Sequence, residues 1–268
     1  MPNITADMVK KLRDQTGAGM MDCKKALAAA EGDMVAALEN LRKAGIAKAA
    51  KKAERTAKEG VVQAQVAGDT AAMVEVLCET DFAAKNPNFV KYAEEVAERV
   101  VDKYDGDCDL GEALKAAEED AIGGLVTQIG ENIQVRRAIR WESNGKFGAY
   151  MHMGGKIGVL VEGEGDADDE LMKDVAMHIA AFNPRYITPE DVPADTLDKE
   201  REIAKAQVEG KPENIIGKIV EGKINKWYSE VCLTKQPWLR DDKSCLAKVA
   251  PNLTIKRFER WSIGEEIS

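Results

Sequence analysis

The sequence predicts an α+β protein, and three observations support this fold class. The first 45 residues repeat apolar positions with helical spacing, whereas the stretches that follow Gly60 and Ile133 alternate between apolar and polar residues as strands do. Each alternating region is followed by another helical segment. The 268 residues are 44% hydrophobic and 32% charged, so we expect a soluble, globular chain with material for one large domain or two to three smaller ones.

Residues 1–45 predict three short helices. Thr5 is suited to cap the first helix, which ends at a Thr16–Gly19 turn. Asp33 is suited to cap the third helix, whose apolar side chains recur every three residues and which we expect to end before Gly45. A unit of this size is marginally stable alone, so we treat it as a mini-domain attached to a larger core.

A basic segment follows, which we interpret as a helical or fraying linker over residues 46–59. Seven basic residues face one acidic residue, Glu54, between Arg42 and Lys58. The segment is either a solvated connector or the contact of an RNA- or ribosome-binding module. It contains no aromatic side chain that could stack on bases, and the chain carries a net charge of −9, so nucleic acid is the less favoured partner.

Residues 60–140 predict the first core subdomain. Two alternating runs flank Gly68-Asp69, which is typical of a hairpin turn. Asn86-Pro87 then predicts a helix start, with asparagine as N-cap and proline in the first turn. A second helical segment follows, and we expect Gly123-Gly124 to interrupt it.

Residues 141–189 and 231–268 predict the second core subdomain. Asn144-Gly145 lies between two alternating runs and predicts another hairpin. A helix is expected over residues 166–182, and the alternating run near the C-terminus could complete the second sheet. The order strand, acidic turn, helix thus occurs twice, which suggests a duplicated unit.

Residues 190–230 predict an antiparallel helical hairpin inserted into this second subdomain. Apolar residues recur with helical spacing on both sides of a Gly210-Lys211-Pro212 break. Two helices joined by a short connection fold back on each other. We therefore expect a projecting helical pair.

No constellation of catalytic residues emerges from the sequence. Gly17-Ala-Gly19 follows a predicted helix, whereas a dinucleotide-binding motif requires a strand there, and Gly154-Gly155-Lys156 lacks the first glycine and the Ser/Thr of a phosphate loop. The acidic residues between positions 162 and 170 do not have calcium-loop spacing and suit a helix start. We expect no enzyme, no cofactor and no metal, with an enzyme that uses Cys23 as a less favoured alternative.

The cysteines and the hydropathy pattern suggest the cytoplasm. The five cysteines are scattered and form no Cys-x-x-Cys motif, as expected in a reducing compartment. No apolar stretch approaches the roughly 20 residues of a membrane helix, and the N-terminus lacks the pattern of a signal peptide. Of the two histidines, His178 is expected in the core.

Phe82 is the first aromatic residue of the chain and stands directly before a predicted helix start, in Cys78-Glu-Thr-Asp-Phe-Ala83. Its pattern alone favours burial beneath its own hairpin, since aromatic side chains are usually buried. The alternative is that Phe82 projects from the end of a strand towards a partner. Small residues, Ala83 and Ala84, follow it and suit this second orientation.

Two motifs resemble the signatures of the bacterial elongation factor Ts family. They are Thr16-Gly-Ala-Gly-Met-Met-Asp-Cys-Lys-Lys-Ala-Leu27 and Cys78-Glu-Thr-Asp-Phe-Ala83, and further similarity runs through Ile129-Gly-Glu-Asn-Ile133, His152 and Lys156-Ile-Gly-Val159. The resemblance implies a ubiquitin-associated-like fold for residues 1–45. It also implies a guanine nucleotide exchange factor whose partner is the GTPase elongation factor Tu.

The resemblance further implies which residues act on that partner. Those that disturb its Mg²⁺ site would be Thr80, Asp81, Phe82 and Ala83, with Phe82 as a wedge and Asp81 either bonding the partner's backbone or capping the turn. The partner-binding residues would be Leu12, Arg13, Met20, Met21, Lys24, Ile129, Gly130 and His152. The family associates the helical hairpin with self-association, so homodimerisation is a further expectation.

Overall fold

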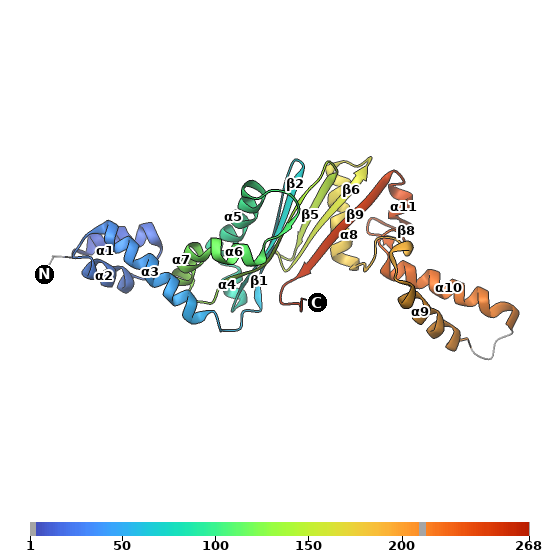
Figure 1. Ribbon diagram of the computed structural model, residues 1–268, viewed down its shortest axis with the longest axis horizontal. Helices are drawn as coiled ribbons and strands as arrows, with labels where there is room; N and C mark the ends of the chain where they lie inside the picture. The colour runs from blue at the N-terminus through green and yellow to red at the C-terminus, as the bar shows by residue number, and fades with distance from the viewer. Residues whose placement is uncertain (1–3, 209–212, 268) are drawn as a thin grey trace. The chain divides into compact units, whose positions relative to one another are not determined.

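The computed structural model describes residues 4–208 and 213–267, which form two compact units of mixed helix and sheet (Figure 1). Unit 1 comprises Met1–Glu142, Met153–Ile157 and Trp261–Ser268, and unit 2 comprises Ser143–His152 and Gly158–Arg260. The predicted α+β class is therefore confirmed. Within the described ranges, no helix combines the length and the apolar character needed to cross a membrane.

Three helices begin unit 1: α1 (Ala6–Thr16), α2 (Met20–Ala29) and α3 (Met34–Lys52). The predicted caps are confirmed, since the Thr5 hydroxyl accepts the Met8 N–H and the Asp33 carboxylate accepts the N–H groups of Val35 and Ala36 in α3. The helices enclose a small apolar core of Val9, Leu12, Ala18, Cys23, Ala26, Leu27, Ala37 and Leu41. Cys23 is fully buried in it.

Two glycines that were expected to break helices lie inside them instead. Helix α3 continues through Gly45 to Lys52, and Gly123 lies within α7 (Glu119–Ile129), so the break in the second helical segment falls at Glu118, after α6 (Gly111–Ala117). The reason is a close crossing of α3 and α7. A Cβ on Gly45 would lie 2.6 Å from the Gly123 carbonyl oxygen, and one on Gly123 would lie 2.8 Å from the Ile46 nitrogen.

The sheet of unit 1 has the strand order β1-β2-β4-β3. Its strands are β1 (Glu59–Ala67), β2 (Thr70–Cys78), β3 (Cys108–Asp109) and β4 (Gln134–Glu142). The Gly68-Asp69 turn joins β1 and β2 as predicted. Helix α5 (Pro87–Lys103), which Asn86 caps as predicted, packs against β1 and β2 through Phe89, Val96 and Val100, among others (Figure 1).

The sheet of unit 2 contains β5 (Lys146–His152), β6 (Ile157–Gly165) and β9 (Leu253–Ser262), in that order. The C-terminal strand therefore completes this sheet, as predicted. Helix α8 (Asp169–Phe182) packs against β5, and a Cβ on Gly148 would lie 2.4 Å from the Met172 carbonyl oxygen. His178 is buried in α8, as expected. The shorter elements are η1 (Pro189–Asp191), β7 (Pro237–Trp238), β8 (Asp241–Cys245) and α11 (Leu246–Val249).

The hairpin predicted at Asn144-Gly145 is wrong. Strands β4 and β5, which flank this bend, belong to different sheets. Strand β4 has β2 and β3 as its neighbours, so its hydrogen-bonding edges are taken by strands of unit 1. The bend therefore connects two sheets.

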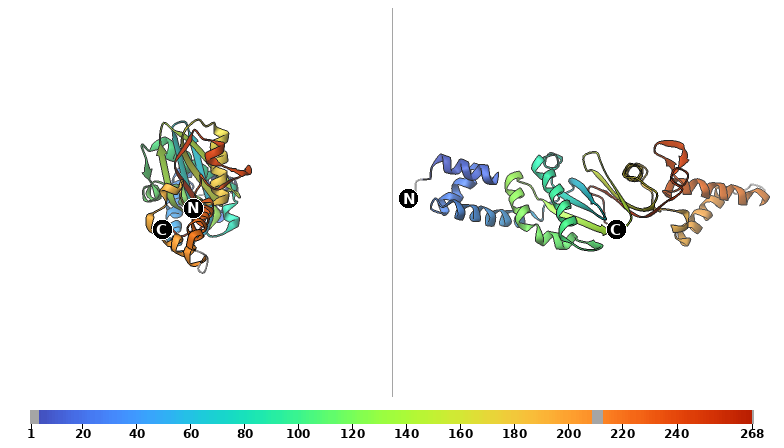
Figure 2. Two further views of the ribbon diagram at one scale, coloured as in Figure 1. Left: turned by 90° about the vertical axis from the view of Figure 1, so that its right-hand side faces the viewer. Right: turned by 90° about the horizontal axis from the view of Figure 1, so that it is seen from above.

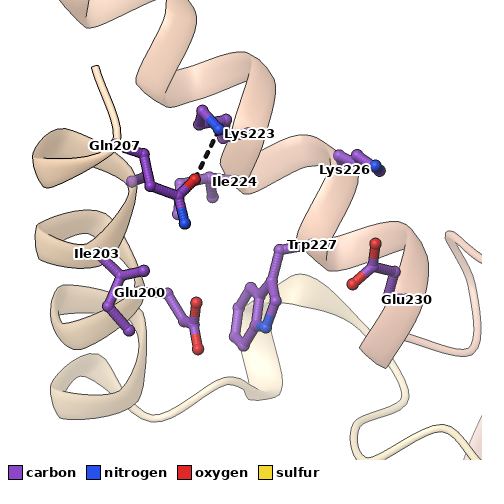
Figure 3. Close-up of a pocket in the computed structure, with 9 residues that line it drawn as sticks. Glu200, Ile203, Gln207, Lys223, Ile224, Lys226, Trp227 and Glu230 are labelled. Carbon is purple, nitrogen blue, oxygen red and sulfur yellow. Dashed lines mark hydrogen bonds between the residues drawn. The ribbon is translucent and has the colours of Figure 1, made fainter.

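Helices α9 (Ala194–Ala206) and α10 (Glu213–Val231) lie side by side and run antiparallel within unit 2 (Figure 2). The predicted break at residues 210–212 lies outside the described residues. Ala204 and Val208 pack against Val220 and Ile224, while Leu197 packs near Trp227. A cleft of 280 Å³ remains between the two helices, beside Trp227 (Figure 3).

Candidate functional site

Phe82 projects from unit 1 and does not pack beneath its own hairpin. It lies in the four-residue helix α4 (Asp81–Ala84), directly after β2, and 83% of its surface is exposed. Its neighbours Ala83 and Ala84 are buried and belong to the apolar core beneath the sheet. Because α4 turns its small residues inward, it presents its aromatic residue to the outside.

Thr80 and Asp81 have different roles in this turn. The Thr80 hydroxyl accepts the Ala83 N–H at 3.2 Å and is therefore the N-cap of α4, so the expectation that Asp81 caps the turn is wrong. Asp81 instead pairs with Lys85 at 2.8 Å on the surface. The hydrogen bond from Lys85 lowers the pKa of the Asp81 carboxyl, which keeps it ionised near neutral pH.

The Ile129-Gly130 turn lies next to Thr80, because Glu131, the residue that follows the turn, bonds to Thr80. Gly130 ends α7 with a φ of 88°, a left-handed conformation that glycine adopts readily, and Ile129 packs partly against the core. The next residue, Glu131, reaches across to β2. Its carboxylate accepts the N–H groups of Glu79 and Thr80 at 3.0 and 2.9 Å, and the Thr80 hydroxyl at 2.6 Å.

A second carboxylate reaches in the opposite direction. Glu79 accepts the N–H of Asn132 at 2.6 Å and lies 3.4 Å from the Arg55 guanidinium. The side-chain amide of Asn132, which is 2% exposed, donates to the carbonyl oxygens of Arg55 and Ala53 at 2.8 and 3.4 Å. Sequence reasoning did not assign Glu131 or Asn132. The available signal was a polar pair placed directly after a helix-ending glycine.

Four of the predicted partner-binding residues near the N-terminus are exposed. Met20 and Met21, in the first turn of α2, are 55% and 62% exposed, and Arg13 and Lys24 are also exposed. Leu12 differs, because its side chain is fully buried in the core of the three helices. It can support a partner-binding surface from below but presents no side-chain area to it.

His152 lies in unit 2, at the end of β5, with an exposed side chain. Its Nδ1 atom is 3.1 Å from the Tyr150 hydroxyl, and the two rings are tilted with centroids 5.8 Å apart. The ring is therefore both accessible and held by a neighbour on the same strand.

Most of the basic segment is engaged by groups of the chain itself. Side-chain contacts pair Arg42 with Asp120, Lys43 with Glu39, Lys48 with Asp22, Lys52 with the Gly130 carbonyl oxygen, and Arg55 with Glu79. Five of the seven basic residues thus have an intramolecular partner. This arrangement leaves less free positive charge for phosphate groups than the sequence suggests.

The remaining candidates for chemistry are occupied with structural contacts. Asp168 caps α8, Glu162 pairs with Arg257 at 2.5 Å and Glu164 pairs with Lys256 at 2.8 Å. Burial raises the pKa of the Cys78 thiol to about 12, so it stays protonated at neutral pH. Across the described ranges, no three His, Cys, Asp or Glu side chains are grouped closely enough to hold a metal ion.

Comparisons with known proteins identify the family. The family model described as elongation factor TS matches residues 79–265. A protein named elongation factor Ts from Halothermothrix orenii is 46% identical over 276 residues, which cover 97% of this chain and 92% of that protein. Its counterpart from Pediococcus pentosaceus is also 46% identical over 276 residues, covering 100% of this chain and 94% of that protein. The chain belongs to the elongation factor Ts family.

Proposed function

We propose that the chain is a guanine nucleotide exchange factor that binds elongation factor Tu in its GDP form and promotes GDP release by disturbing the partner's Mg²⁺ site. Family membership supports this function. The single observation that carries the mechanism is Phe82, an aromatic side chain 83% exposed at the end of a strand. Among the exposed large apolar side chains of the described residues, Phe82 has the highest exposed fraction, and an aromatic side chain can bury a large area against a partner with few rotatable bonds.

An exchange factor breaks no covalent bond, so it needs neither catalytic groups nor a cofactor of its own. It acts by binding the nucleotide-free partner more tightly than the nucleotide-loaded one. Linkage then requires that the nucleotide bind the complex more weakly by the same factor. Each tenfold weakening corresponds to about 1.4 kcal/mol of differential contact.

Phe82 can supply much of this differential contact. A phenylalanine side chain buries on the order of 150 Å² or more when it enters a pocket. At about 25 cal/mol per Å², 150 Å² corresponds to roughly 4 kcal/mol, or roughly 500-fold in affinity. The magnesium ion bridges phosphate oxygens of the nucleotide, so displacing the groups around it loosens the diphosphate.

The neighbouring residues have supporting roles in this mechanism. Thr80 and Ala83 fix the turn, and the charged carboxylate of Asp81 can accept hydrogen bonds from the partner's backbone. The additional contact residues are Arg13, Met20, Met21, Lys24, Ile129 and Gly130 in unit 1, with Leu12 supporting them from the core of the three helices, and, separately, His152 in unit 2. Methionine side chains suit an adaptable surface because they are flexible and polarizable.

The proposal also covers the architecture of the chain, its self-association and where it acts. We assign residues 1–45 a ubiquitin-associated-like fold and relate the core subdomains, residues 60–140 and residues 141–189 with 231–268, by duplication. The recurring order of a central strand and a helix, β2 then α5 and β6 then α8, supports that duplication. Homodimerisation through the hairpin at residues 190–230 and action in the cytoplasm complete the assignment. RNA binding through residues 46–59 is not favoured, because most basic side chains there already have partners.

The test is the release of a fluorescent GDP analogue from elongation factor Tu, followed by stopped flow at saturating concentrations of the chain. We expect strong acceleration by the wild type and a large reduction with Phe82→Ala. Phe182→Ala, which removes an aromatic side chain that is 40% exposed in unit 2, is the matched control and should leave the rate unchanged. No acceleration by the wild type would refute the function, and full acceleration by Phe82→Ala would refute the wedge.

A further inference from the structure

We propose that Glu131 is a positioning residue for Phe82: its carboxylate sets the orientation of the turn that carries the wedge. This inference rests on the proposed exchange function. The hydrogen bonds of Glu131 run to Glu79 and Thr80, so it acts on Phe82 through Thr80. Three features of unit 1 support it.

The first feature is that both oxygens of the Glu131 carboxylate are used by the turn. One oxygen accepts two backbone N–H groups, those of Glu79 and Thr80, and the other accepts the Thr80 hydroxyl at 2.6 Å. The same hydroxyl accepts the Ala83 N–H. Thr80 therefore relays the position of the carboxylate into the first turn of α4, and hydrogen bonds to an ionised acceptor are stronger than neutral ones.

The second feature is that α4 is short and depends on a few contacts, among them the Asp81–Lys85 pair and the Thr80 N-cap. A helix of four residues cannot form by itself, since the first turn costs more conformational entropy than its hydrogen bonds return. Only Ala83 and Ala84 of this helix are buried, and Phe82 contributes almost no packing of its own. The direction in which Phe82 points is therefore set by the burial of Ala83 and Ala84 together with the N-cap and what holds the N-cap.

The third feature is that the contact is reciprocal. The turn that contains Glu131 is held in return by Glu79, which accepts the Asn132 N–H at 2.6 Å. Asn132 in turn donates to the carbonyl oxygens of Ala53 and Arg55, the residues that follow α3. Asn132 is buried, Glu79 and Glu131 are half-buried and Thr80 is exposed, so the network is anchored inside the unit at Asn132 and reaches the surface at Thr80. The wedge is thus preorganised before any partner binds, which reduces the entropy lost on binding.

A positioning role predicts a specific kinetic pattern. If Glu131 only orients Phe82, loss of its hydrogen bonds should lower the rate of GDP release at saturating concentrations of this chain. The reason is that Phe82 would be correctly oriented in fewer of the bound complexes. The concentration needed for half-maximal rate would change little, since other surfaces also contribute to binding. The loss would also vanish once Phe82 itself is removed, because the two residues then act as one unit.

The experiment measures release of a fluorescent GDP analogue from elongation factor Tu with four variants: Glu131→Gln, Phe82→Ala, the double variant, and Glu119→Gln as control. Glu119 is an exposed carboxylate in the first turn of α7, so its variant should match the wild type. Glu131→Gln keeps the shape but replaces one acceptor oxygen by an NH2 donor, so the side chain can no longer accept both the backbone N–H groups and the Thr80 hydroxyl, and we expect about a tenfold lower maximal rate. The double variant should be no slower than Phe82→Ala.

Amide hydrogen exchange distinguishes a local loosening of the turn at residues 79–83 from a loss of stability of the whole unit. In Glu131→Gln, the amides of Glu79, Thr80 and Ala83 should exchange faster, while that of Val96 in α5 should stay protected. Thr80→Val removes the relay hydroxyl with little change of shape and should slow release in the same way.

The outcomes separate the two levels of the proposal. A wild-type maximal rate with Glu131→Gln, or an equal loss in the presence and absence of Phe82, would overturn the positioning role while leaving the exchange function intact. A wild-type chain that does not accelerate release would instead overturn the exchange function, and the positioning role with it.

Discussion

The close crossing of α3 and α7 gives a prediction that can be worked out from neighbouring positions. Gly123 faces α3, and an added methyl group there would lie 2.8 Å from the Ile46 nitrogen and 3.0 Å from the Gly45 carbonyl carbon. Gly124 follows it in the same helix and has no atom within 4 Å of the corresponding position. Alanine at these two positions therefore tests packing with helix propensity held constant.

The two substitutions should change the free energy of unfolding in opposite directions. Replacing a glycine inside a helix by alanine stabilises a protein by roughly 0.5–1 kcal/mol when space is available, so Gly124→Ala should gain this amount. Gly123→Ala should gain the same propensity but lose about 1–3 kcal/mol from the clash with the backbone of α3. We expect a net loss of about 1–2 kcal/mol, because backbone atoms cannot move aside as a flexible side chain can.

The assay is thermal unfolding followed by circular dichroism. At about 2–4 °C per kcal/mol for a chain of this size, Gly124→Ala should raise the midpoint by a few degrees and Gly123→Ala should lower it. Gly45→Ala should behave like Gly123→Ala, since its added carbon would lie 2.6 Å from the Gly123 carbonyl oxygen. If Gly123→Ala and Gly124→Ala raised the midpoint equally, α3 and α7 would not cross as closely as described.

Two further predictions concern buried ionisable groups. Glu75 is fully buried and bonded to two arginines, so Glu75→Gln should lower the free energy of unfolding, measured in urea, by about 3 kcal/mol. Glu164→Gln removes one partner of an exposed ion pair and should lower this free energy by less than about 1 kcal/mol. Equal losses for the two variants would contradict the prediction. Burial lowers the pKa of His178 below its ordinary value of 6.5, so the folded protein favours the neutral ring. The contribution of this ring to the free energy of unfolding is therefore fully present above pH 6.5 and is lost as the pH falls below 6.5. His178→Gln should therefore reduce the decline in unfolding free energy between about pH 7 and pH 5, and a decline unchanged by this substitution would refute the assignment.

Features fixed by local hydrogen bonds could be predicted from the sequence. The helix caps Thr5, Asp33 and Asn86 form as expected, because an N-cap needs only its own side chain and the next two or three N–H groups. The Gly68-Asp69 turn is local in the same sense. It joins two strands that pair directly with each other.

Features that depend on distant partners could not be predicted in this way. Glycine is unfavourable inside an isolated helix, so Gly45 and Gly123 suggested helix ends, yet each is required where another helix crosses. Asn144-Gly145 has the local signal of a hairpin, but the strand before it pairs with other segments of unit 1. In both cases tertiary contacts overrode a correct local preference.

The candidate site shows the same division. Phe82 drew attention from its sequence position and from the family resemblance, but only the structure shows that it is exposed. Glu131 lies 51 residues from Thr80 in the sequence, and its side chain was not assigned a role although its turn was. The sequence signal for Glu131 was an acidic residue directly after Gly130, the glycine that ends α7. Its role as a hydrogen-bond acceptor could not be predicted, because it depends on the end of β2 lying beside it.

The central claim is differential binding, and it is tested most directly by measuring the affinity of this chain for elongation factor Tu with and without GDP in isothermal titrations. A ligand shifts an equilibrium only by the difference in its affinity for the two states. The account predicts much tighter binding to the nucleotide-free form, with a ratio that shrinks when Phe82 is replaced by alanine. Equal affinity for the two forms would contradict it.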